Sequence, residues 1–319
     1  MNSFGYAKPG TVDDAVSLLS SNWGKTEVLA GGTDLLSSIK NGLSTPDLLV
    51  SLKDVEGLDK ISKKGGALHI GATATLADLQ TNKVAAKNFP AITTAIKNIG
   101  AAQMINMGTV GGDLLQRPRC WYYRNGLGLF GNGLVADGDN RYHAIFGNSG
   151  DAKFVHASSL APALIALGAT VHVAGADGKR DVEAAKFFST PSSDGDRESV
   201  LKPNEILTGV SVPLSGMKNG IYEIRQRIGL DWPMVAAAVA FKESGGKASD
   251  ATVVLGHVAP TPWVAAKAGA ALNGQSASGA AEKAGSAAAD GATPLSKNGY
   301  KVQQVKVAVK RAIQAALDA

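Results

Sequence analysis

Two glycine-rich turns constrain the fold of this chain more than any other feature of its sequence. The first turn, at residues 30–34 (Ala-Gly-Gly-Thr-Asp), follows a short apolar strand and precedes a helix expected from Leu35. The second, at residues 108–113 (Gly-Thr-Val-Gly-Gly-Asp), lies about 75 residues later. Because glycine permits positive φ, consecutive backbone N–H groups in such turns can converge on an anion. Either turn alone is equally explained as a capped helix start, but two together can hold a diphosphate from opposite sides.

Composition and charge exclude several classes of protein. The 319 residues carry 32 basic and 27 acidic side chains, and the net charge of +5 is spread along the chain, which argues against nucleic-acid binding. The one cysteine, Cys120, cannot form an internal disulfide, and the five histidines lack metal-ligand spacing. We therefore predict no metal site. The first residues lack the pattern of a signal peptide, and no apolar run is long enough for a membrane span.

The order of the expected elements predicts an α+β protein. Residues 1–218 are expected to form one domain, with subdomains at about 1–58 and 59–218, and residues 219–319 a smaller C-terminal domain. Alanine-rich segments in the last third are predicted to be packed helices because alanine has high helix propensity. Helices are expected at 11–19, 76–81, 91–99, 160–167, 262–272, 277–289 and 302–317, and strands at 48–52, 67–70, 171–173, 206–212, 221–227, 235–241 and 251–258.

Three further segments have more than one interpretation. Residues 126–131 fit the pattern G-x-G-x-x-G, but no strand precedes them and Asn132-Gly133 breaks any following helix, so a glycine-rich loop is the better interpretation. Residues 117–124 combine cations with aromatic side chains, which suits a ring-stacking site, a protein interface or a solvated loop. Asp139 is either an acceptor for ribityl or ribose hydroxyls or an ordinary turn residue.

The ordered combination of these motifs resembles a known family. The two glycine turns, followed by Gln-Arg-Pro-Arg-Cys-Trp-Tyr-Tyr-Arg at residues 116–124, are similar to the FAD-binding medium subunit of the molybdenum hydroxylase (xanthine dehydrogenase) family, closest to its aldehyde oxidoreductase branch. Residues 225–233 resemble the opening of the family's C-terminal domain. The resemblance covers nearly the whole chain. It implies an FAD-binding fold of the vanillyl-alcohol oxidase (PCMH) type with two α+β subdomains, followed by a C-terminal α+β domain of the CO dehydrogenase flavoprotein type.

Carried over by position, the resemblance implies a set of FAD contacts. The two turns would hold the pyrophosphate, Ile99 and Leu207 would make apolar contacts, and Gln116 and Asp139 would make polar ones. No catalytic acid or base is implied, since such a protein positions and tunes the flavin. The implied cofactor-binding residues are Val28, Leu29, Ala30, Gly31, Gly32, Thr33, Asp34, Leu35, Leu36, Ile99, Gly108, Thr109, Val110, Gly111, Gly112, Asp113, Gln116, Asp139 and Leu207.

The chain departs from the family pattern in three places. Asp113 stands where many relatives have asparagine, and Glu223 lies where relatives often place a lysine near the flavin, so that Arg225 or Arg227 would have to substitute. The aldehyde oxidoreductase branch carries a [4Fe–4S] cluster on four cysteines. Only Cys120 matches here, and Ala152 stands in place of the fourth. We therefore predict that this chain carries no [4Fe–4S] cluster.

The resemblance implies an electron-transfer function. Electrons from a molybdenum-cofactor large subunit, which oxidises an aldehyde or heterocycle, would pass through [2Fe–2S] centres of a small subunit to this FAD and then to an external acceptor. Separately from the resemblance, the crowding of arginines near the second glycine turn leads to the hypothesis that Arg117, Arg119 or Arg124 stabilises an anionic reduced flavin. Two alternatives remain: a self-sufficient flavoprotein oxidase or reductase, and a non-catalytic scaffold subunit. A cytoplasmic heterotrimer is expected, with export alongside a signal-bearing partner as the alternative.

Overall fold

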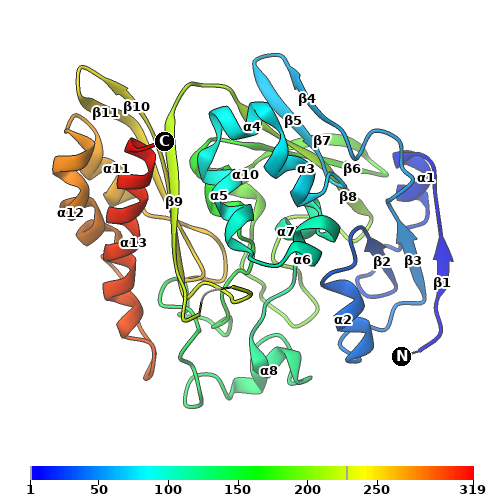
Figure 1. Ribbon diagram of the computed structural model, residues 1–319. Helices are drawn as coiled ribbons and strands as arrows, with labels where there is room; N and C mark the ends of the chain where they lie inside the picture. Colours follow the sequence, from blue (N-terminus) through cyan, green and yellow to red (C-terminus); the bar gives the residue numbers. More distant parts are fainter. Residues whose placement is uncertain (1, 228) are drawn as a thin grey trace.

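Three β-sheets follow one another along the chain and lie in a row across the molecule (Figure 1). The computed structural model describes residues 2–227 and 229–319. An N-terminal sheet of three strands lies beside a central sheet of five, and a C-terminal sheet of four lies at the opposite side. No helix among the described residues has the length and apolar character needed to cross a bilayer.

The N-terminal sheet is parallel and carries the first glycine turn. Its strands lie in the order β1 (Gly5–Ala7), β3 (Leu48–Ser51) and β2 (Thr26–Leu29). Two helices flank it, α1 (Val12–Ser17) and α2 (Leu35–Lys40). Thr11 caps α1 by accepting a hydrogen bond from the Asp14 backbone N–H at 3.1 Å. Because β2 runs directly toward α2, the turn at residues 30–34 lies at the carboxyl end of the sheet.

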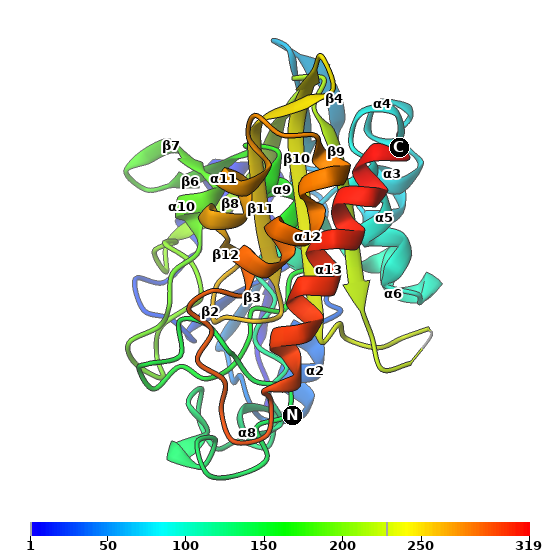
Figure 2. The ribbon, with the colours of Figure 1, turned by 90° about the vertical axis from the view of Figure 1, so that its left-hand side faces the viewer.

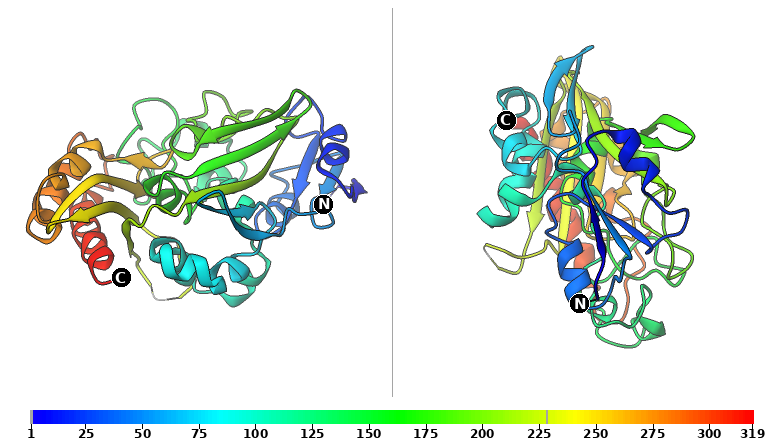
Figure 3. Two further views of the ribbon diagram at one scale, coloured as in Figure 1. Left: turned by 90° about the horizontal axis from the view of Figure 1, so that it is seen from above. Right: turned by 90° about the vertical axis from the view of Figure 1, so that its right-hand side faces the viewer.

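The central sheet is antiparallel, and its apolar face forms the main core. Alternate residues of each strand point inward, so that Leu68 and Ile70 are buried while His69 between them is only partly buried. Helices α3 to α6 gather on one side of this sheet (cyan in Figure 3). The strands, in spatial order, are β4 (Ile61–Lys64), β5 (Ala67–Gly71), β8 (Glu205–Pro213), β6 (Thr170–Gly175) and β7 (Gly178–Glu183). The helices are α3 (Leu76–Thr81), α4 (Lys83–Asn88), α5 (Pro90–Asn98), α6 (Ala102–Met107), α7 (Val110–Leu114), α9 (Ala161–Ala166) and α10 (Ala184–Phe187).

The C-terminal sheet is buried on both faces. Its antiparallel strands lie in the order β12 (Trp263–Val264), β11 (Lys247–Gly256), β10 (Val235–Ser244) and β9 (Lys218–Ile224). The helices α11 (Ala266–Leu272), α12 (Ala277–Ala288) and α13 (Tyr300–Leu317) cover its outer face (Figure 2). Small residues permit this close packing: a Cβ on Gly285 of α12 would lie 2.5 Å from the Lys306 carbonyl oxygen of α13. The alanine-rich segments are therefore packed helices, as predicted.

A long segment between α7 and α9 carries only α8 (Trp121–Arg124) and a short 3₁₀ turn, η1 (Gly131–Gly133). Its later part is anchored to the C-terminal domain by a buried lysine. The ammonium group of Lys301 donates to the carbonyl oxygens of Tyr142, His143 and His257 at 2.9, 3.1 and 2.9 Å. Burial lowers the pKa of Lys301 to about 7, and the three carbonyl acceptors match the three donors of its charged form.

The predicted helices and strands are present in the structure, but some of their boundaries differ and several short elements were missed. The helix expected at residues 262–272 is wrong at its start, because Trp263 and Val264 pair with β11 as the edge strand β12 and α11 begins only at Ala266. The strand expected at 221–227 begins earlier, at Lys218, and ends at Ile224. Five short helices, α4, α6, α7, α8 and α10, were not predicted, and neither were the short strands β1 and β4.

Candidate functional site

The first glycine turn presents a row of unpaired backbone donors. Gly32 has a φ of 75°, in the left-handed region that favours glycine. Within residues 2–227 and 229–319, no atom accepts a hydrogen bond from the backbone N–H groups of residues 31–34. Successive N–H groups around a turn that mixes negative and positive φ form a concave anion-binding surface. This turn can therefore bind an anionic group.

The second glycine turn is held in place by hydrogen bonds on both sides. The Thr109 hydroxyl accepts from the Gly112 backbone N–H at 3.1 Å and so caps α7. The Val110 backbone N–H donates to the Ala74 carbonyl oxygen at 3.0 Å, which ties the turn to the segment before α3. These hydrogen bonds hold the second turn between α7 and the segment before α3.

The two turns touch through backbone alone. A Cβ added to Gly31 would lie 1.9 Å from the Met107 carbonyl oxygen and 2.9 Å from its carbonyl carbon. Only a residue without a side chain fits at this position. The approach brings the free N–H groups of the first turn beside Thr109 and Gly112 of the second.

Two cavities meet at this junction. The larger has a volume of about 640 Å³ and lies between β2 and β8. The smaller has a volume of about 210 Å³ and lies between the second turn and residues 225, 227 and 230–233. The residues that line both are Thr33, Asp34, Thr109, Gly112 and Gln116. The arrangement fits a ligand with a bulky group at each end and an anionic bridge at the turns.

Most of the implied cofactor residues line these cavities. They are Val28, Ala30, Gly31, Gly32, Thr33, Asp34, Leu35, Ile99, Gly108, Thr109, Gly111, Gly112, Asp113, Gln116 and Leu207. Four others lie outside both cavities. Leu29 and Val110 are buried in the hydrophobic cores, and Leu36 is 39% exposed with its side chain close to Gly32. Asp139 forms an exposed ion pair with Arg141 at 2.7 Å, so its carboxylate is directed to that neighbour.

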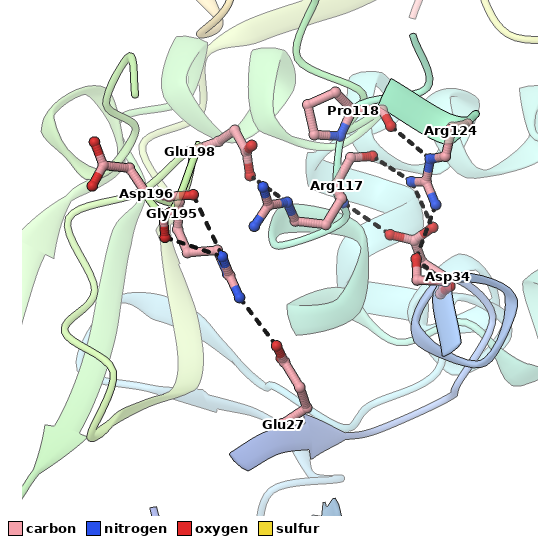
Figure 4. Close-up of polar contacts among 10 residues, drawn as sticks. Glu27, Asp34, Arg117, Pro118, Arg124, Gly195, Asp196 and Glu198 are labelled. Atoms are coloured by element: carbon pink, nitrogen blue, oxygen red, sulfur yellow. Dashed lines mark hydrogen bonds and ion pairs between the residues drawn. The ribbon is translucent and has the colours of Figure 1, made fainter. Parts of the chain in front are cut away.

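The carboxylate of Asp34 is engaged by the arginine-rich segment rather than free for a ligand (Figure 4). It accepts from the Arg117 backbone N–H and from Arg124 Nη2, both at 2.9 Å, and from Arg119 Nη1. The Arg124 guanidinium also donates to the Pro118 and Arg117 carbonyl oxygens at 2.8 and 2.9 Å. Asp34 therefore fastens residues 117–124 to the first glycine turn, and only Arg119 of the three arginines lines the smaller cavity.

Two further ion pairs border the larger cavity. Arg117 Nε lies 3.3 Å from Glu198 Oε2, and Arg197 Nη2 lies 3.0 Å from Glu27 Oε1 (Figure 4). Burial raises the pKa of Glu198, and the nearby Arg117 charge opposes that rise. The Arg197 guanidinium also stacks on Trp23, 4.7 Å from the ring centroid. The Arg197–Glu27 pair connects the loop before β8 to β2, and the Arg117–Glu198 pair connects the same loop to the arginine-rich segment.

The structure explains the unusual Asp113. Its carboxylate accepts from the Ser158 hydroxyl, from the Leu160 backbone N–H at 3.0 Å and from Gln116 Nε2 at 3.1 Å. Burial raises the pKa of Asp113, and these hydrogen bonds oppose the rise. The carboxylate is thus bound by the residues that precede α9, and its negative charge is offset by donors of this chain.

Several cavity residues were missed by the sequence analysis. Trp23, Asp194, Arg197 and Glu198 line the larger cavity, and Trp232 lines the smaller one. Asp194 lies in a loop that had no assigned role, and its Oδ1 accepts from the Leu129 backbone N–H at 2.8 Å. No local motif marks these residues, because each reaches the site through a contact distant in sequence.

Cys120 lies in an apolar cluster. Ala152 and Leu129 are buried there with Phe154, and Cys120 packs against them. Cys120 Sγ lies 3.1 Å from His143 Nε2, a neighbour not evident from the sequence. Burial raises the pKa of the thiol, and burial lowers the pKa of His143 to about 4, so both groups are neutral at pH 7. Among the described residues, no group of three or more potential metal ligands is present. The predicted lack of a [4Fe–4S] cluster stays a prediction.

Comparison with known families identifies the chain. Residues 2–215 match the FAD binding domain in molybdopterin dehydrogenase. The chain belongs to this FAD-binding family. Residues 220–316 match the CO dehydrogenase flavoprotein C-terminal domain. The family assignment confirms the resemblance, the fold class and FAD as the cofactor, and it makes the chain a subunit of oxidoreductase type.

Individual relatives of this FAD-binding family cover most of the chain. The aldehyde oxidoreductase FAD-binding subunit PaoB of Escherichia coli (strain K12) is 30% identical over 82% of this chain and 84% of its own length. The carbon monoxide dehydrogenase medium chain of Afipia carboxidovorans is 30% identical over 98% of this chain and 96% of its own. In the crystal structure of Cu,Mo-CO dehydrogenase in its cyanide-inactivated form, a chain of 27% identity superposes with a TM-score of 0.78, covering 100% of this chain and 99% of that one.

Proposed function

We propose that this chain is the FAD-carrying electron-transfer subunit of a molybdenum-containing hydroxylase that oxidises an aldehyde or a heterocycle. The observation that carries the proposal is the junction of two glycine turns between two cavities. The unpaired N–H groups of residues 31–34 fit the diphosphate of FAD. The contact that only Gly31 permits keeps those donors beside Thr109.

The two cavities suit the two ends of FAD. We assign the adenosine end to the larger cavity, where Leu207 and Trp23 supply apolar surface. The flavin ring is assigned to the smaller cavity, whose walls combine Ile99 with Trp232 and Arg225. The implied residues that line neither cavity, such as Leu29 and Val110, support the turns through the core.

The role of this chain's own residues is binding and positioning. FAD, when bound, supplies the capacity to accept electrons from one partner and pass them to another. The amides of the first turn hold the diphosphate, and the Asp34 ion pairs keep residues 117–124 closed over the junction. Asp113 and Ser158 fix the second turn relative to α9. None of these groups has to donate or remove a proton during turnover.

The proposed partners are a large subunit with the molybdenum cofactor and a small subunit with [2Fe–2S] centres, as in the heterotrimer expected from the sequence. The relatives support this assignment, since medium chains of carbon monoxide dehydrogenases match this chain along its length. We also propose that electrons leave the flavin for an external acceptor. The cytoplasmic location stays a prediction, which fractionation of cells that produce the complex would test against export with a partner.

The experiment is the visible spectrum of the purified protein, followed by acid release and chromatographic identification of the chromophore. We expect flavin absorption and release of FAD in a ratio near one per chain. A colourless protein that takes up no FAD would contradict the proposal and support the scaffold alternative. Turnover of a small substrate by the chain without partners would instead support a self-sufficient flavoprotein.

A further inference from the structure

A buried ion pair stands beside the smaller cavity. Arg225 donates from Nε and Nη2 to Oε2 of Glu223 at 3.1 and 2.5 Å, and from Nη1 to the Gly229 carbonyl oxygen at 3.3 Å. The Arg225 side chain is 13% exposed and that of Glu223 only 1% exposed. Both residues follow Ile221 at intervals of two along the chain. Because Ile221 packs in the central core, this face of β9 is directed toward α5. Arg225 directly follows the last residue of β9 and lines the smaller cavity together with Asp113.

The arginine is only partly satisfied within the chain. A guanidinium has five N–H donors, and the three contacts of Arg225 leave two of them without an acceptor among residues 2–227 and 229–319. The group lines the smaller cavity. Its unused donors are therefore available to a ligand there, while its partner holds the guanidinium from the buried side.

The burial of Glu223 is costly and needs an explanation. Burial raises the pKa of its carboxyl group, and the charge of Arg225 opposes that rise. Glu223 Oε1 has no partner with hydrogen-bond geometry among the described residues, although the Asn98 side chain also opposes the rise in pKa. A buried carboxylate with one oxygen unsatisfied contributes little to stability. Its evident effect is to fix the orientation of the guanidinium.

The other cations around the smaller cavity are engaged differently. Arg119 binds Asp34 and stacks on Trp232, 4.8 Å from the ring centroid. The Arg227 side chain is 78% exposed and lies 3.8 Å from Asp231. Of these three arginines, Arg225 has the least exposed side chain, and its partner Glu223 is more deeply buried still.

We propose that Arg225 is the charge that tunes the bound flavin and that Glu223 is its positioning residue. The inference rests on the proposed function. Two-electron reduction with uptake of one proton leaves one negative charge on the flavin ring, the electrons coming from the [2Fe–2S] centres of the proposed partner. A fixed guanidinium stabilises that charge more than it stabilises the neutral oxidised ring, and so it raises the reduction potential.

The test is an equilibrium titration of the flavin against a reference dye, read from the visible spectrum of the purified FAD-containing protein. Arg225→Gln should lower the equilibrium constant for reduction about tenfold, as loss of one nearby charge implies. Glu223→Gln keeps an acceptor but removes the counter-charge, and should raise the constant. Arg311→Gln is the matched control, because Arg311 is exposed on α13, contacts Tyr222 of β9 and lines neither cavity. Its constant should stay within about twofold of the native value.

The possible results distinguish failure of the role assigned to Arg225 from failure of the proposed FAD-binding function. If Arg225→Gln contains FAD and its equilibrium constant for flavin reduction equals the native one, the inference is overturned. A decrease that occurs in Arg119→Gln but not in Arg225→Gln also overturns it. If Arg225→Gln does not retain FAD, Glu223→Gln decides instead, and an unchanged constant overturns the inference. A native protein without flavin contradicts the proposed function itself.

Discussion

A methyl group on Gly31 is the smallest perturbation that tests how the two glycine turns meet. In Gly31→Ala, the new Cβ would lie 1.9 Å from the Met107 carbonyl oxygen, whereas an ordinary contact begins at 3.4 Å. The turns must therefore separate by about 1.5 Å, the difference between these two distances. The obstacle is backbone on both sides, so no side-chain rotation relieves it. Since φ of Gly31 lies outside the left-handed region, the effect is steric.

The expected consequence is loss of FAD affinity. A misplacement of about 1 Å costs on the order of 100-fold when several groups must act together, which equals about 3 kcal/mol of binding free energy. The free energy of unfolding of the apoprotein should fall by about 1–3 kcal/mol, as in other overpacked sites. Affinity is measured by titrating apoprotein with FAD and following quenching of flavin fluorescence, and stability by urea unfolding.

The matched control is Gly10→Ala. Gly10 also lies outside the left-handed region, and no atom lies within 4 Å of the position of an added Cβ. The control should bind FAD like the native protein. If Gly31→Ala binds FAD within about threefold of Gly10→Ala, the turns do not act together on the cofactor, and the argument for the diphosphate site is refuted.

Two further predictions concern stability. Asp34→Asn removes the negative partner of Arg119 and Arg124; we expect the free energy of unfolding to fall by about 2 kcal/mol, and an unchanged urea midpoint would show that Asp34 does not fasten the loop. Burial, together with the Lys301 charge, lowers the pKa of His257 to about 3. Below pH 6.5 the unfolded chain therefore binds a proton that the folded chain excludes, and stability decreases as the pH falls, by about 1.4 kcal/mol per unit. His257→Asn, which suits the φ of 60° at this position, should remove that part of the slope between pH 6 and pH 4; equal slopes would contradict the assignment.

The glycine turns and the principal helices and strands were predictable because their signals are local. Thr11 caps its helix through the backbone N–H of Asp14, only three residues further along the chain, and the alternation around Ile70 is a property of the strand itself. Packing modified these predictions at element boundaries. Trp263 joins a strand because β11 offers it a partner, which no local pattern of residues 262–272 reveals.

The roles of charged side chains were the least predictable part of the site. Asp34 was assigned to the pyrophosphate, yet its carboxylate binds arginines 85 and 90 residues away in sequence. Asp113 was an unexplained anion, and its partner Ser158 lies 45 residues further on. Such pairings depend on which loops the fold brings together, and a carboxylate looks the same in sequence whether its partner is a ligand or an arginine.

By itself, the sequence determined the family, the cofactor class and the two turns that can bind a diphosphate. The turns are evident because glycine permits positive φ, and the residues around each glycine pair have the pattern of a turn that leads into a helix. Only the tertiary structure decided that the turns touch at Gly31, that two cavities meet there, and that Arg225 faces one of them with Glu223 behind it. The reason is physical: backbone conformation is set mainly by adjacent residues, whereas cavities and buried ion pairs arise from contacts between segments that only folding brings together.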